Sequence, residues 1–174
     1  MDKKELRRLV ASAVLALVIF AICISSAVLV ATSGVSEIQL GTGSKAYDQY
    51  LACVRFSWPS GGADLGFAIM GSISVYLGLA MLVTGIAIIV LKRAFRYVYL
   101  PIAGFISIEV AAFLLQAFSV FEFDLNLGEK AALPVLFMIF AILLYLLGFA
   151  CLVLTYIFPR RFVAARLDDD RPLK

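Results

Sequence analysis

Glu109 is the side chain best placed to do chemistry in this 174-residue chain, because it is the one charged residue inside any of four long apolar segments. A carboxyl group near the middle of a bilayer is costly and marks either a polar contact or a transport path. At about 1.5 Å per helical residue, Glu109 lies about 20 Å from both Arg96 and Glu122, close to the midplane. No basic residue is available at that depth, and desolvation favours the neutral acid. We therefore expect Glu109 to be protonated at neutral pH.

Two further polar side chains are predicted to join Glu109. Gln116 falls on the same helical face, and Tyr145 lies at the same depth on the inward stripe of the fourth apolar segment. Tyr76 has a similar depth but points away from its helix's glycine face. The predicted intramembrane network is thus Glu109, Tyr145 and Gln116. Its role is either a structural cross-link between helices or a site of cation or proton passage.

The chain offers no catalytic constellation. It has no histidine, its three cysteines form no C-x-x-C pair, and its spans contain no paired carboxylates. We therefore predict no enzyme activity, no cofactor and no metal. Cys53, the one cysteine of the long outer loop, is either a free thiol or an intermolecular bridge.

The composition is that of a membrane protein, with 63% hydrophobic residues. Each apolar segment exceeds the roughly 20 residues that a spanning helix needs, and together they make one membrane domain over residues 1–174. The predicted spans are residues 9–33, 65–91, 97–121 and 131–158. They leave outer loops at residues 34–64 and 122–130 and a tail at 159–174.

Basic residues indicate the orientation of these spans. They cluster before the first span, between the second and third, and after the fourth. The positive-inside rule places these clusters, and with them both termini, in the cytoplasm. Separate clusters of this kind predict orientation in a bilayer rather than binding to nucleic acid. The sequence does not distinguish the plasma membrane from an endomembrane.

Short connections force consecutive helices to be neighbours, so we predict an all-α, antiparallel, left-handed four-helix transmembrane bundle. Its second span carries a glycine seam, a stripe of small residues that lets another helix approach closely. The seam comprises Gly71, Ser74, Gly78 and Gly85. Its partner is either another span of this chain or a second subunit.

Aromatic residues gather in the first outer loop, at Tyr47, Tyr50, Phe56 and Trp58. They predict a short strand or helix on the membrane surface, where such rings suit the headgroup region. The same residues could contact a partner protein, and the sequence favours neither role.

Four spans, a longer first outer loop and a short second one resemble the plan of claudin-type and MARVEL-type membrane proteins. Claudin-type loops carry a tryptophan motif and two cysteines, whereas this loop has Trp58 and Cys53 alone. The resemblance is one of layout, and it assigns no site residue.

The leading functional prediction is a non-enzymatic tetraspan protein, an accessory subunit or membrane organiser that acts through its glycine seam and its aromatic outer loop. Its partners would be other integral membrane proteins or further copies of itself, within the lipid bilayer. The alternative is a small channel or transporter subunit that uses Glu109. The two hypotheses predict different effects of the substitution Glu109→Gln. The first predicts that folding and partner binding are preserved, and the second predicts that ion or proton flux is lost while assembly is unchanged.

Overall fold

The computed structural model describes residues 3–32, 45–57, 63–124 and 132–169. These residues are helical apart from short turns and contain no strand. The elements are α1 (Lys3–Thr32), α2 (Lys45–Arg55), α3 (Ala63–Leu91), the 3-10 turn η1 (Phe95–Tyr97), α4 (Tyr99–Asp124) and α5 (Ala132–Asp169). Four of them, α1, α3, α4 and α5, are long and apolar enough to cross a membrane, which confirms the prediction of four such helices.

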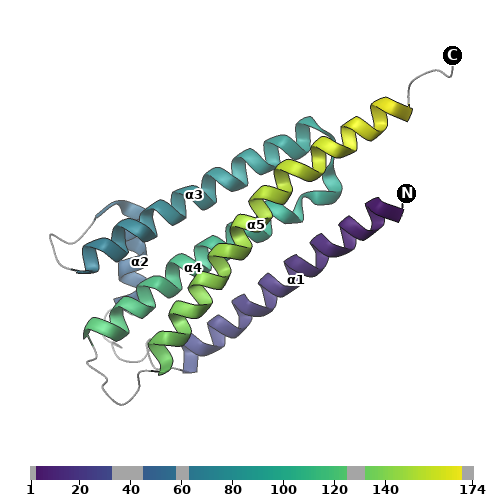
Figure 1. Cartoon of the computed structure of the whole chain (residues 1–174). Coiled ribbons are helices and arrows are strands. Elements are labelled where there is room, and N and C mark those ends of the chain that lie inside the picture. The colour runs from purple at the N-terminus through teal and green to yellow at the C-terminus, as the bar shows by residue number, and fades with distance from the viewer. Residues whose placement is uncertain (1–2, 33–44, 58–62, 125–131, 170–174) are drawn as a thin grey trace.

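The central helix is α4, which contacts α1, α2, α3 and α5. In its most apolar window 56% of the residues are buried, against 11% for α1. Figure 1 shows α1 at the edge of the bundle, with its N-terminal end and the C-terminal end of α5 toward the same end of the molecule. The helix least held by its neighbours is therefore α1.

Small residues allow α4 and α5 to approach closely. A side chain at Gly148 would meet Ile108 at 2.8 Å and the Gly104 carbonyl oxygen at 3.3 Å. Beside this crossing, the Ser107 hydroxyl donates a 2.6 Å hydrogen bond to the Leu144 carbonyl oxygen. Close backbone contact and an interhelical hydrogen bond are the main cohesive interactions available between helices in lipid.

The glycine seam of α3 faces the interior. Gly78 packs on Ile108 and Glu109 of α4, and Gly85 packs on Pro101 and Thr155 of the neighbouring helices. Gly71 faces Gln116 of α4 and Cys53 of α2. The sequence left open whether another helix of this chain or a second subunit packs on the seam. In the structure, α2, α4 and α5 of the same chain pack on its glycines.

The turn between α3 and α4 joins the bundle to α1. Arg93, two residues after the end of α3, adopts a φ of 50°, and the Ala94 amide donates to the Ile89 carbonyl oxygen at 2.9 Å, which closes the helix end. Arg96 in η1 lies 3.8 Å from the Glu5 carboxylate near the start of α1. The beginning of α1 and the α3–α4 connection therefore lie at the same end of the molecule.

Candidate functional site

The first outer loop contains a helix that packs against the bundle. Ala46, Tyr50 and Cys53 of α2 recur every three or four residues and form one face, and Ala46 and Cys53 are fully buried. Asp48 in its first turn and Arg55 in its last turn suit the helix dipole. This face contacts α3 and α4. The aromatic segment, predicted as a surface strand or helix, is therefore a helix docked on the bundle.

Side chains of α3 hold the C-terminal end of α2. The Ser72 hydroxyl donates to the Cys53 carbonyl oxygen at 2.9 Å, and the Tyr76 hydroxyl donates to the Val54 carbonyl oxygen at 2.9 Å. Phe56 adopts a φ of 55° and stacks on Tyr76, with ring centroids 4.5 Å apart. These contacts satisfy carbonyl groups that every helix end leaves without an intrahelical partner.

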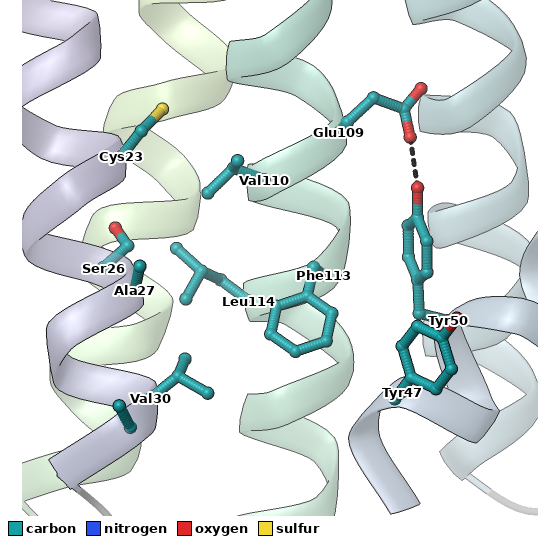
Figure 2. Close-up of a pocket in the computed structure, with 11 residues that line it drawn as sticks. Cys23, Ser26, Ala27, Val30, Tyr47, Tyr50, Glu109, Val110, Phe113 and Leu114 are labelled. Atoms are coloured by element: carbon teal, nitrogen blue, oxygen red, sulfur yellow. Dashed lines mark hydrogen bonds between the residues drawn. The ribbon is translucent and has the colours of Figure 1, made fainter. Parts of the chain in front are cut away.

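Glu109 receives its hydrogen bond from α2. The Tyr50 hydroxyl donates to Glu109 Oε2 at 2.6 Å, as Figure 2 shows. The other carboxyl oxygen lies beside Gly78, where a Cβ would approach it to 3.3 Å. Burial, followed by this hydrogen bond, raises the pKa of the Tyr50 phenol. The phenol therefore stays neutral and keeps a proton to donate at physiological pH.

The structure does not form the direct Glu109–Tyr145 hydrogen bond expected from the sequence. The Tyr145 hydroxyl is buried near Ser74. It forms no hydrogen bond with any of the described residues. Gln116 is buried and donates from Nε2 to the Phe67 carbonyl oxygen at 2.9 Å. Glu109 and Gln116 thus bond to different partners, Tyr50 of α2 and Phe67 of α3.

The aromatic loop residues differ in their surroundings. Tyr47 and Phe56 are exposed, Tyr50 is partly buried, and Trp58 lies outside the described residues. The Cys53 thiol is free, and its burial raises its pKa, which lowers its reactivity. In this conformation Cys53 is shielded from an intermolecular partner by α3.

A pocket of about 500 Å³ opens between α1, α2 and α4. Figure 2 shows Glu109 toward one end of the pocket lining and Val30 and Tyr47 toward the other. Its walls are mainly apolar and include Cys23, Ala27 and Val30 of α1, Tyr50 of α2, and Glu109 and Phe113 of α4. The sequence did not predict the pocket, because the pocket depends on where α2 packs relative to α1 and α4. Of the four long helices, α1 is the least buried.

The pocket is not enclosed but opens to the surroundings of the bundle. Among the described residues no group of three or more His, Cys, Asp or Glu side chains could hold a metal ion.

Comparison with protein families, with curated protein sequences and with solved structures finds no match. The similarity in layout to claudin-type and MARVEL-type proteins stays a prediction.

Proposed function

We propose that the chain is a non-enzymatic tetraspan membrane protein, an accessory subunit or membrane organiser that binds a spanning helix of another protein or of a second copy. The observation that carries this proposal is an exposed stripe of small and β-branched residues along α1. The reasoning begins with how the helices lie in the membrane.

The proposed arrangement is an antiparallel, left-handed bundle with both termini in the cytoplasm. The 3.8 Å approach of Arg96 to Glu5 supports a common side for two of the three basic clusters, and that side is cytoplasmic by the positive-inside rule. The seven-residue recurrence of Gly71, Gly78 and Gly85 suits left-handed packing.

In this arrangement α2 enters the bilayer without crossing it. Ser72, which donates a hydrogen bond to the Cys53 carbonyl oxygen at the end of α2, is about 10 Å along α3 from Leu65, the first residue of its candidate span. Backbone that turns back at such depth is tolerated only where protein covers it. The contacts of Ser72 and Tyr76 with α2 provide that cover.

The outer stripe of α1 has the spacing of a helix-pairing seam. Its members alternate by three and four residues, all are exposed, and they comprise Ala11, Val14, Val18, Ala21, Ser25, Val28 and Thr32. The opposite face carries the three buried residues, Ser12, Ile19 and Ser26. Small side chains at this spacing let a second membrane helix approach closely and gain van der Waals contact.

Two surfaces suggested by the sequence are less suited to this role. The glycine seam faces α2, α4 and α5, and Tyr50 of the aromatic loop faces Glu109. The seam and Tyr50 are therefore occupied within the chain, and of the other loop aromatics Tyr47 and Phe56 are exposed. The α1 stripe has a pattern that fits a membrane partner, and its residues are exposed within the part of the chain that the structure describes.

The test replaces small residues of the stripe by larger ones. We expect the double variant Ala21→Leu, Ser25→Leu to weaken association at least about tenfold, because bulk at the crossing separates the helices. The measurement is the mass and composition of the complex in native nanodiscs over a dilution series. A partner that co-purifies with the wild type supports the proposal only if the double variant no longer binds that partner.

The matched control is Leu17→Phe, Ile24→Phe, which adds bulk to exposed positions of α1 outside the stripe. It should leave association unchanged. A wild-type chain that is monomeric at every concentration, or a double variant that associates like the wild type, contradicts the proposal.

The second candidate is a channel or transporter subunit, and one observation favours it: the pocket reaches Glu109 from the side of α1. Membrane carboxyl groups that line a cavity often belong to ion or proton pathways. We expect Glu109→Gln to abolish proton or cation flux in reconstituted vesicles with assembly unchanged, if this candidate holds. Absence of flux in the wild type excludes it for the chain alone.

A further inference from the structure

The pocket between α1, α2 and α4 combines apolar walls with a single carboxyl group. Val30, Phe113 and Leu114 offer hydrocarbon surface. Two of the hydroxyl groups in its lining already donate elsewhere. Ser26 donates to the Ile22 carbonyl oxygen at 2.7 Å, and Tyr50 donates to Glu109 at 2.6 Å. Most of any occupant must therefore be apolar.

Glu109 retains capacity to accept hydrogen bonds. Once ionised, the carboxylate has two oxygens with about four acceptor positions, and the described residues supply one donor, Tyr50. No Lys or Arg within the described residues lies at ion-pair distance from it. In a medium of low dielectric constant, a positively charged group of the ligand is the natural complement of this carboxyl group.

Aromatic rings beside the carboxyl group also favour the binding of a positively charged ligand group. Tyr47, Tyr50 and Phe113 all border the pocket, and the rings of Tyr50 and Phe113 pack edge to face with centroids 6.0 Å apart. Figure 2 shows the Tyr50 ring between Glu109 and Tyr47. Aromatic faces attract ammonium groups through the ring quadrupole.

We propose that this pocket binds a membrane-soluble amphiphile with an apolar body and one basic amine, and that the Glu109 carboxyl group holds the amine. The proposal relies on insertion of the bundle in a bilayer but not on association through the α1 stripe. The apolar body lies between α1 and α4, where Val30 and Phe113 are found.

Binding transfers one proton within the site. Glu109, which we expect to be neutral in the empty protein, loses its proton to an amine that arrives from the bilayer as the uncharged base. The carboxyl O–H bond breaks and an N–H bond forms, which leaves an ammonium carboxylate pair without any further reactant. Tyr50 continues to donate its hydrogen bond to the carboxylate.

The test uses Cys23, a half-buried thiol in the pocket wall, as a native reporter. The full chain in phosphatidylcholine nanodiscs is treated with N-ethylmaleimide in the presence of dodecylamine or of dodecanol. Peptide mass analysis then gives the alkylation rate of Cys23. We expect half-protection at a dodecylamine concentration at least about tenfold below that of dodecanol, the size of one charge-assisted hydrogen bond.

Two variants and one spectrum make the test specific. Glu109→Gln should remove the preference for the amine, while Ala27→Trp, which fills the pocket, should abolish protection by both probes. If Glu109→Gln does not fold, infrared spectra of the wild type decide. Dodecylamine should convert a carboxylic acid band into a carboxylate band, and dodecanol should not.

Stronger protection by dodecylamine, together with the infrared change, supports the proposal. Equal protection by the two probes overturns it and leaves a site for hydrocarbon chains alone. Protection by neither, or a preference that survives Glu109→Gln, also overturns it. Because every measurement is made on protein recovered in nanodiscs, failure of membrane insertion is seen separately as a loss of recovery.

Discussion

Gly85→Leu is expected to destabilise the bundle by at least about 3 kcal/mol, the upper part of the range for overpacked cores. A Cβ at position 85 would lie 2.6 Å from the Pro101 Cβ and 3.2 Å from the Thr155 methyl group. The Pro101 ring is rigid and buried, so it cannot turn aside. The new side chain must therefore separate α3 from α4 and α5.

The measurement is reversible unfolding in mixed micelles of increasing dodecyl sulfate content. Gly66→Leu is the matched control, since it lies on the same helix and a Cβ there meets nothing within 4 Å. We expect the control to change the free energy of unfolding by less than about 0.5 kcal/mol. Equal stability of the two variants would contradict the close α3–α4 approach.

Gly71→Leu is expected to detach α2 from the bundle. A Cβ at position 71 would meet Gln116 Nε2 at 2.6 Å and the Cys53 thiol at 2.8 Å. Pushing α2 away also breaks the hydrogen bonds from Ser72 and Tyr76 to the end of that helix. Losing about two to three such interactions should raise the exposure of Cys53 to reagent by on the order of 100-fold.

Alkylation by a water-soluble maleimide measures this release, with Cys53 distinguished from Cys23 and Cys151 by peptide mass. In the wild type the fully buried Cys53 should react slowly. Gly66→Leu again serves as the control and should retain wild-type protection. If Cys53 of Gly71→Leu reacts at the wild-type rate, α2 is not held where the structure places it.

The contact between Tyr50 and Glu109 shows where sequence reasoning is limited. The three- and four-residue spacing of Ala46, Tyr50 and Cys53 is consistent with a helix, but tyrosines in a loop suit the membrane interface equally well. Helical period alone does not indicate which surface a short helix covers. The signal that could have found the contact is the lone carboxyl group, which requires a donor, combined with the small residues of α3 that admit α2.

The sequence by itself determined four long apolar helices, a stripe of small residues along α3 and a single carboxyl group within the third apolar segment. It could do so because apolar length and helical period are local properties of the chain. Only the tertiary structure decided that Gly71 faces Cys53, that Tyr50 reaches Glu109, and that α1 borders a pocket. These features depend on contacts between residues far apart in sequence, where the packing of whole helices selects one partner among several of similar depth.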